Sequence, residues 1–309
     1  MPAAPRYAVL ICTRNRPDDL ARTLASLDDQ RMPGPLALFV VDGSSPDVRR
    51  RNRSAVHATR VPSRYLPFCD RPSLPRQRNR GLDALPPSVE IVFFLDDDVT
   101  LHDGYLCTIA ALFDRRPAVG GVGGRQVPPP PERASSVLRR MARYIFLLDH
   151  PAPGRLLPSG HISGYHRVST STPFEVEWLC GFSCAFRRSL LQMERFDPDL
   201  DGYALFEDRD VSIRMAQRTT LMVHPEATLT HHVSPINRYD VARFHHTAVV
   251  NRHWLVRKHR QAGLSRSAWA WSLFGQWMAL RMSTRDAAPA QQGFWAGLRE
   301  VIAAYATPA

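Results

Sequence analysis

The sequence is poor in lysine and cysteine and has no long apolar segment. Lys258 is the only lysine, so arginine carries almost all of the positive charge. The five cysteines are an odd number without disulfide-framework spacing, which predicts reduced thiols. No stretch reaches the roughly 18 apolar residues of a membrane-spanning helix, and residues 7–12 are too short for the apolar core of a signal peptide. We therefore expect a cytoplasmic protein, free in solution or at the inner face of the membrane.

The remaining composition is typical of a globular protein. The 309 residues are 44% hydrophobic and 22% charged, which suits one large domain with an appendage. The formal net charge is +11. A cationic surface favours anionic partners, so nucleotide diphosphates, acidic lipid headgroups and nucleic acid are the classes to consider.

Short apolar segments alternate with helix-like segments along most of the chain. Segments that predict buried strands are residues 7–12, 36–41, 91–95, 174–187 (with a glycine break) and 227–232. Segments that predict helices are residues 17–27, 75–85, 104–113 and 207–218. This alternation predicts an α/β fold with a mostly parallel sheet flanked by helices. In such sheets ligands bind beyond the carboxyl ends of the strands, where residues 13–15, 42–44 and 96–98 fall.

Three consecutive carboxylates, Asp96, Asp97 and Asp98, end one of the apolar strands. Repulsion and desolvation oppose this arrangement unless a positive charge lies nearby. Side chains two apart on an extended segment share a face, so Asp96 and Asp98 can converge on one divalent cation. Oxygen ligands suit Mg²⁺ or Mn²⁺, which in turn bind phosphate. The alternative is a solvated acidic turn.

Two later segments supply further candidate residues. In the helix-like segment from Glu207, Asp210 and Arg214 have the spacing of a surface ion pair, which leaves Asp208 as the better candidate for a general base. His231 and His232 end a strand and face opposite ways, so at most one can join a metal site. The alternative for either histidine is a structural role.

Arginines gather in two segments of the sequence. Arg76, Arg78 and Arg80 lie in one helix-like segment, and Arg14 and Arg16 follow the first strand. Arginine pairs well with phosphate, although a solvated basic face is the alternative interpretation.

Taken in order, these elements resemble the inverting family 2 glycosyltransferases of the GT-A fold. The matching segments are residues 12–17, 41–44, 78–81, 95–98, 178–188, 207–210 and 227–231. The resemblance covers roughly residues 7–235. It predicts a GT-A nucleotide-sugar-binding and catalytic domain at residues 1–235, followed by a C-terminal helical region at residues 236–309.

The resemblance also implies roles for individual residues. Asp208 would be the catalytic base. The metal, Mg²⁺ or Mn²⁺, would be bound by Asp96, Asp98 and His231, with His232 as the fallback. The donor nucleotide sugar would be bound by Thr13, Arg14, Asp42, Arg78, Asp96 and Asp97, with Asp42 on the base or ribose. The candidates for the acceptor site are Trp178, Gly181, Phe182 and Glu207.

We therefore expect a metal-dependent inverting hexosyl- or deoxyhexosyltransferase that uses a UDP- or dTDP-sugar. Its acceptor would be a carbohydrate, lipid-linked or small-molecule hydroxyl, in cell-surface polysaccharide or glycolipid synthesis. Two other classes compete: a metal-dependent nucleotidyltransferase or phosphoesterase, and a basic nucleic-acid-binding protein. The clustered carboxylates argue against nucleic acid as a partner, because they would repel a phosphate backbone.

The C-terminal region contains five of the six tryptophans. Residues 267–280 are apolar nearly all round and are flanked by Arg266 and Arg281. Such a helix packs internally or forms a homodimer, and the alternative is a peripheral contact with a membrane.

Overall fold

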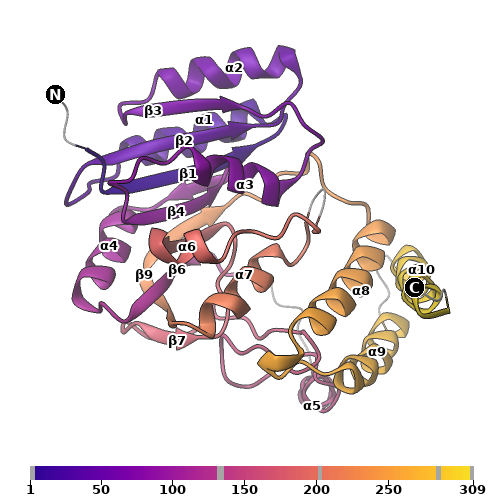
Figure 1. Cartoon of the computed structure of the whole chain (residues 1–309). Coiled ribbons are helices and arrows are strands. Elements are labelled where there is room, and N and C mark those ends of the chain that lie inside the picture. Colours follow the sequence, from indigo (N-terminus) through magenta and orange to yellow (C-terminus); the bar gives the residue numbers. More distant parts are fainter. Residues whose placement is uncertain (1–3, 131–135, 201–203, 283–286, 307–309) are drawn as a thin grey trace. The chain divides into compact units, whose positions relative to one another are not determined.

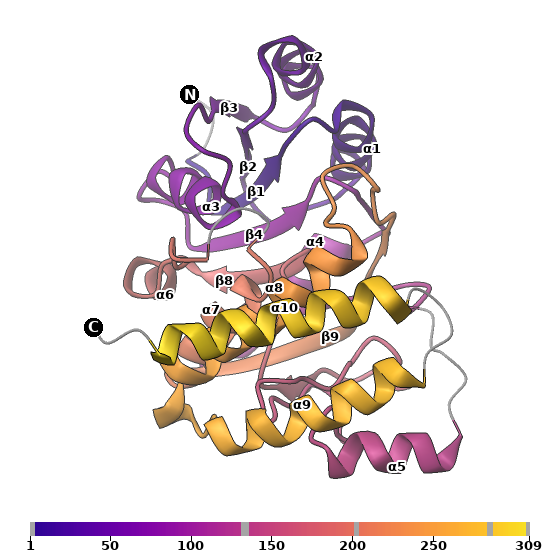
Figure 2. The ribbon, with the colours of Figure 1, turned by 90° about the vertical axis from the view of Figure 1, so that its right-hand side faces the viewer.

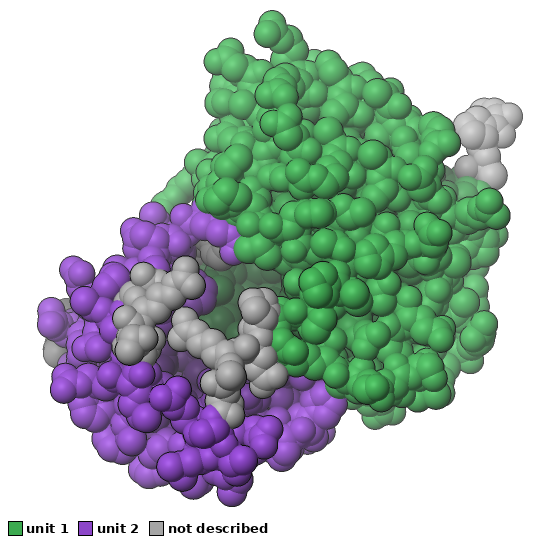
Figure 3. Space-filling view, turned by 180° about the vertical axis from the view of Figure 1, so that it is seen from behind, with its two compact units in different colours: residues 1–130, 165–237 green, residues 131–164, 238–309 purple. Residues whose placement is uncertain are grey.

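The computed structural model describes residues 4–130, 136–200, 204–282 and 287–306. The chain divides into two compact units (Figure 3). Unit 1 comprises Met1–Pro130 and Tyr165–Asn237, and unit 2 comprises Pro131–Gly164 and Arg238–Ala309. The second segment of unit 1 ends at Asn237, and unit 2 includes residues 131–164 together with the C-terminal residues.

Unit 1 is built on one mixed sheet. Its strands are β1 (Tyr7–Thr13), β2 (Leu36–Asp42), β3 (Ser63–Pro67), β4 (Ile91–Asp96), β5 (Val99–Leu101), β6 (Val119–Gln126), β7 (Phe174–Val176), β8 (Ser183–Arg187) and β9 (Thr220–His231). The described strands are ordered β3-β2-β1-β4-β8-β6-β9-β5, and β7 also pairs with β9. The first four can be followed in Figure 1. The first four are parallel, as are β6 and β9, whereas β8 runs antiparallel to β4 and β6.

Helices cover both faces of the sheet in unit 1. They are α1 (Pro17–Asp28), α2 (Pro46–His57), α3 (Leu74–Asp83), α4 (Tyr105–Arg115), α6 (Arg188–Met193) and α7 (Glu207–Ala216). Figure 2 shows α1 and α3 on opposite sides of β1 and β2. Alternate side chains of a strand point to opposite faces, so Val9 and Ile11 pack in the core with α1 while Leu10 faces α3. A Cβ at Gly81 of α3 would collide with Leu10, so this helix needs glycine to lie against the strand.

The apolar strands form because they are buried on both faces, as the sequence predicted. Every residue of β1 from Tyr7 to Ile11 and of β4 from Ile91 to Leu95 is buried. Helix α1 begins with Pro17 and carries Asp18 and Asp19 in its first turn, where the helix dipole favours negative charge.

Unit 2 consists of helices and, at residues 146–164, a loop with one isolated β-bridge between Leu156 and Ile162, over its described residues. Its helices are α5 (Val137–Ile145), α8 (Val241–Lys258), α9 (Arg266–Arg281) and α10 (Ala287–Ala306), with a short 3₁₀ turn at Arg260–Ala262. Helix α8 packs closely along α10 and also contacts α9. The C-terminal helices expected from the sequence are therefore present. Within the described part of the chain, no helix combines the length and apolar character needed to cross a membrane.

Candidate active site

Strand register brings the predicted site residues to one edge of the sheet in unit 1. Thr13 of β1 lies opposite Asp42 of β2, and Cys12 lies opposite Asp96 of β4. The antiparallel pairing of β5 with β9 then sets Val99 opposite His231. Because Val99 directly follows Asp98, this register carries a histidine from far along the chain to the acid triplet.

Asp96, Asp98 and His231 form a cluster suited to a metal ion. One ligand atom from each lies within 4.8 Å of the other two. The Nε2 atom of His231 is 3.1 Å from Oδ1 of Asp98. Among the described residues this is the group of three or more potential ligands that meets the distances of a metal site.

The environment of Asp98 stabilises its negative charge. The amide of Ser234 donates to Oδ2 across 2.8 Å, and Nη1 of Arg16 lies 3.6 Å from the same oxygen. Although burial opposes the shift, His231, Ser234 and Arg16 lower the pKa of Asp98 to about 2. Partial burial and the charge of Asp98 raise the pKa of Asp96 above its usual value. The two carboxylates therefore repel each other in a way that a cation would relieve.

The middle carboxylate of the triplet faces another way. Oδ2 of Asp97 accepts a hydrogen bond from the Thr13 hydroxyl at 2.6 Å, and Oδ1 accepts one from Nη1 of Arg16 at 3.0 Å. The side chain is buried, and both of its oxygens are paired within the protein. Asp97 and Thr13, to which the resemblance assigns a role at the donor, are hydrogen-bonded to each other where β1 and β4 end.

A buried arginine links the acid triplet to the later carboxylates. Nη1 of Arg78 donates to Oε1 of Glu207 at 2.7 Å, and Nη2 donates to the Gly181 carbonyl at 2.9 Å. Nη2 also lies 3.6 Å from Oδ1 of Asp96. Burial raises the pKa of Glu207 to about 8, against the opposing effect of Arg78. Arg78 is thus occupied by protein groups and is not displayed to solvent.

Asp208, the predicted base, is held by backbone amides next to this arginine. Gly181 donates to its Oδ2 at 3.3 Å, and the amide of Arg209 donates to its Oδ1 at 2.8 Å. The side chain is half-buried. Asp208 and Glu207 therefore share the Gly181 loop as a common support, which fixes the position of the Asp208 carboxylate.

Aromatic rings continue from the cluster toward the predicted acceptor residues. The ring centroid of Phe182 lies 4.4 Å from His231 and 5.7 Å from His166, on which it stacks. Tyr165 adjoins His166 on one side and Trp178 on the other, with centroid separations of 4.5 and 4.8 Å. His166 and Ser234 are site neighbours for which the sequence pattern gave no signal, because each is brought in by a loop.

Three other candidates do not belong to the group of potential metal ligands. Asp42 is fully buried and accepts hydrogen bonds from Asn52, Tyr65 and the Ser44 amide. Arg14 is exposed. The Nε2 of His232 lies 2.8 Å from Oγ1 of Thr100.

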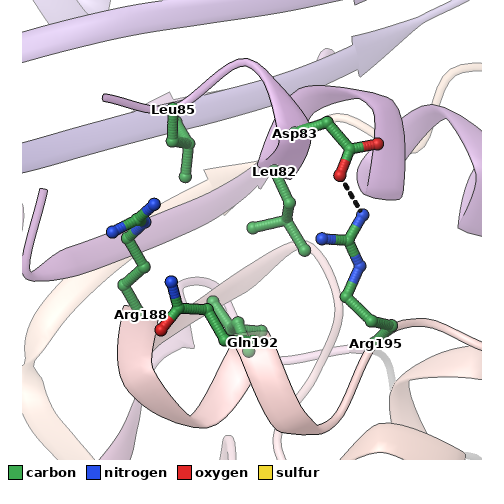
Figure 4. A pocket seen from close by; sticks show the side chains of 7 residues that line it. Leu82, Asp83, Leu85, Arg188, Gln192 and Arg195 are labelled. Atoms are coloured by element: carbon green, nitrogen blue, oxygen red, sulfur yellow. Dashed lines mark hydrogen bonds and ion pairs between the residues drawn. The ribbon is translucent and has the colours of Figure 1, made fainter. Parts of the chain in front are cut away.

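A separate pocket of about 170 Å³ lies between α3 and α6 (Figure 4). Its lining residues are Leu82, Asp83, Leu85, Arg188, Leu191, Gln192 and Arg195. Arg195 donates to Asp83 at 2.6 Å on one side of it. None of the site residues predicted from the sequence lines this pocket.

The family model described as "Glycosyl transferase family 2" matches residues 8–192 of the chain. The chain belongs to glycosyl transferase family 2. This assignment confirms the family and the glycosyltransferase class predicted from the sequence, over the competing nucleotidyltransferase and nucleic-acid-binding classes. No curated protein sequence matches the chain.

Solved structures confirm the GT-A fold of this glycosyltransferase. A mannosyltransferase from Pyrobaculum calidifontis, in complex with GDP-Man and Mn²⁺, is 16% identical with a TM-score of 0.56, and the match covers 100% of this chain and 78% of that one. TarS 1-349 from S. aureus is 14% identical with a TM-score of 0.54, covering 97% and 82%. GalNAc-T7 with UDP, GalNAc and Mn²⁺ is 13% identical with a TM-score of 0.59, covering 88% and 55%.

Proposed function

We propose that this glycosyltransferase moves a hexosyl or deoxyhexosyl group from a nucleoside diphosphate sugar to an acceptor hydroxyl, with inversion at the anomeric carbon. The observation that carries the proposal is the cluster of Asp96, Asp98 and His231 at one edge of the sheet. Arg78 connects this cluster to the loop that supports Asp208. The arrangement offers a site for a diphosphate and, beside it, a carboxylate that can act as a base.

The residues present fit a divalent metal ion. Oδ1 of Asp98 is buried and has no hydrogen bond of good geometry, so it is left with a lone pair for a cation. Two carboxylates and one imidazole are ligands that Mn²⁺ accepts, and Mg²⁺ shares the preference for oxygen. A bound cation would stabilise the negative charge of the departing diphosphate. Two of the similar solved structures contain Mn²⁺.

For the donor we propose a UDP- or dTDP-sugar. One TarS structure is in complex with UDP-GlcNAc, whereas the mannosyltransferase structure contains GDP-Man. A donor screen should therefore also include GDP-sugars. The proposed nucleotide-sugar-binding residues stay Thr13, Arg14, Asp42, Arg78, Asp96 and Asp97. Because Asp42 is already paired with Asn52 and Tyr65, direct contact with a base would require these bonds to rearrange.

Asp208 is the proposed base. Its carboxylate would take the proton of the acceptor hydroxyl while the acceptor oxygen forms a bond to the anomeric carbon. The bond from that carbon to the diphosphate oxygen breaks, and its electron pair leaves with the nucleoside diphosphate. Attack from the face opposite the leaving group inverts the configuration, and no covalent glycosyl-enzyme is formed.

The acceptor is proposed to lie beside Gly181 and Phe182. Phe182 gives an apolar ring next to His231, against which a sugar face can stack. Trp178 and Glu207 are buried, which suits support of this loop better than direct contact with the acceptor. The proposed acceptor is a hydroxyl group of a carbohydrate, a lipid-linked molecule or a small molecule. The proposed role is in polysaccharide or glycolipid synthesis. The cytoplasmic location also stays a prediction.

The variant Asp208→Asn tests this mechanism. We expect transfer to fall by about 10²–10⁴-fold while donor affinity, measured by calorimetry, stays within a few-fold. The control Asp199→Asn removes an exposed carboxylate and should leave both quantities unchanged. NMR of the product anomer tests inversion. Retained configuration, or equal losses of transfer and donor affinity in Asp208→Asn, would contradict the proposal.

A further inference from the structure

Helix α5 of unit 2 exposes its apolar face. Val137, Leu138, Met141 and Ile145 are between 52% and 79% exposed. Their spacing places them within one arc of the helix, and the arginines of α5 occupy the opposite arc. No residue of α5 is buried. The helix therefore has the amphipathic pattern of a packed helix, but the described residues of unit 2 leave more than half of each of these side chains exposed.

Helix α9 adds a second apolar stripe beside α5. Trp271, Phe274 and Met278 are spaced to share one helical face and are between 36% and 49% exposed. The Trp271 indole donates to the Ile145 carbonyl at 2.8 Å, and the ring centroid of Phe146 lies 5.0 Å from that of Trp271. Figures 1 and 2 both show α5 next to α9.

We call the exposed apolar side chains of these two helices the α5–α9 surface. It consists of Val137, Leu138, Met141, Ile145, Trp271, Phe274 and Met278. Exposed apolar side chains gathered on two neighbouring helices mark an interaction site.

The charge of the chain is concentrated in the same unit. Unit 2 contains 15 of the 40 Lys and Arg residues but only 5 of the 29 Asp and Glu residues, a net charge of +10 out of +11. Helices α5 and α9 contain no acidic residue, and their basic residues are Arg139, Arg140, Arg143, Arg266 and Arg281. Of these, Arg143 pairs with Asp149 at 3.3 Å. The partner of this surface should therefore be both apolar and negatively charged.

We propose that the α5–α9 surface lies on an anionic lipid bilayer, with α5 parallel to the membrane plane. In that position Leu138, Met141 and Ile145 would enter the boundary between headgroups and acyl chains. Arginine stems can run along the apolar boundary while their guanidinium groups reach lipid phosphates. Trp271 has the amphipathic ring that is typical of headgroup depth. The proposal is independent of which sugar, metal or acceptor the transferase uses.

A lipid surface fits these observations better than a second copy of the chain. Two copies meeting through this face would bring unit 2, with its net charge of +10, against itself. Nucleic acid would match the charge but would leave exposed leucine, methionine and isoleucine without a partner.

Sedimentation of the full chain with lipid vesicles tests the proposal. We expect binding to phosphatidylcholine vesicles that contain phosphatidylglycerol and much weaker binding to phosphatidylcholine alone. The double variant Leu138→Ser with Met141→Ser should lose at least about tenfold in partitioning. Met193→Ser is the matched control, because Met193 is an exposed methionine of unit 1. It should bind as the unmodified chain does.

A charge-matched pair of variants tests the electrostatic part. Arg139→Gln with Arg140→Gln should weaken binding to anionic vesicles about 25-fold, at roughly fivefold per arginine. Arg31→Gln with Arg50→Gln removes two exposed arginines of unit 1 and should change binding by less than about threefold. All four positions are exposed, so the melting temperature should not move.

A spectroscopic measurement keeps the result independent of protein yield. Brominated acyl chains should quench tryptophan emission of the vesicle-bound chain, and Trp271→Phe should reduce that quenching. Two binding results would overturn the proposal: equal binding to neutral and anionic vesicles, or binding that the α5 variants do not change. It would also be overturned if the unmodified chain does not bind vesicles and instead forms a homodimer that dissociates in Leu138→Ser with Met141→Ser.

Discussion

The guanidinium of Arg78 donates to the carboxylate of Glu207 at 2.7 Å, joining α3 to α7 across 129 positions of sequence. The same guanidinium lies over the rings of Phe94 and Phe196, 5.5 and 5.0 Å from their centroids. It also reaches the Gly181 carbonyl at 2.9 Å. One buried cation therefore fixes the position of the loop that holds Asp208 relative to the strand that carries the acid triplet.

Replacing Arg78 by glutamine should both destabilise and inactivate the enzyme. Breaking a buried ion pair leaves one charge without a partner, which costs about 3–5 kcal/mol in the free energy of unfolding. Urea unfolding measures this loss, and turnover should fall further than the lost folded fraction explains. Arg76→Gln, an exposed arginine of the same helix, is the control. Equal behaviour of the two variants would contradict the linking role.

Gly181 should tolerate no side chain. A Cβ there would lie 2.9 Å from Oε1 of Glu207 and 3.2 Å from Cβ of Asp208, so the loop or the carboxylates must move. We expect Gly181→Ala to lower kcat by at least about tenfold, since small displacements of catalytic groups cost that much. The matched substitution Gly164→Ala meets nothing within 4 Å and should be silent. Wild-type turnover in Gly181→Ala would show that this packing is irrelevant to catalysis.

His166 should make the fold sensitive to acid. Burial, helped by His231 and Arg125, lowers its pKa from 6.5 to about 4. Between these values the unfolded chain binds a proton at this position that the folded chain does not. The stability that neutral His166 contributes is therefore complete above pH 6.5 and is lost as the pH falls toward 4, by at most roughly 3 kcal/mol.

The variant His166→Asn tests this pH dependence. Nδ1 of His166 accepts a hydrogen bond from the Gln126 amide at 3.1 Å, and the oxygen of asparagine can take over that role without titrating. The decline in unfolding free energy from pH 6.5 to 4 should be shallower in the variant. A decline as steep as in the unmodified chain would rule out His166 as its source.

The sequence predicted elements whose residues are uniform in character. Strands β1, β2 and β4 were predicted to within one residue because a strand buried on both faces is apolar without interruption. Strand β6 was not predicted, because four of its eight residues are glycine. Those glycines are needed by neighbours: a Cβ at Gly121 would lie 2.8 Å from the ring of Phe186. Helix α2 was not predicted from the sequence. Only two of its residues, Asn52 and Val56, are buried, so it has no apolar pattern to reveal it.

The candidate site was predictable in its carboxylates but not in their partners. An acid triplet after an apolar strand is a local pattern, so Asp96 and Asp98 could be singled out. The choice between His231 and His232 depends on the register of β5 with β9, which no local pattern encodes. The occupation of Arg78 by Glu207 depends on packing over more than a hundred residues, and burial of this kind has no sequence signature.

Removing His231 should weaken metal binding, whereas removing its neighbour should not. His231 lies 3.1 Å from Asp98, while His232 lies 2.8 Å from the Thr100 hydroxyl. His231→Ala should therefore raise the Mn²⁺ concentration needed for half-maximal transfer by at least about tenfold. His232→Ala is the matched control and should leave that concentration within about twofold.

Direct titration of Mn²⁺ in the presence of UDP, followed by electron paramagnetic resonance, tests the central claim that Asp96, Asp98 and His231 hold a divalent cation. The account predicts one tight site in the unmodified chain, loss of that site in Asp98→Asn, and weakened binding in His231→Ala but not in His232→Ala. Unchanged Mn²⁺ affinity in both Asp98→Asn and His231→Ala would contradict it.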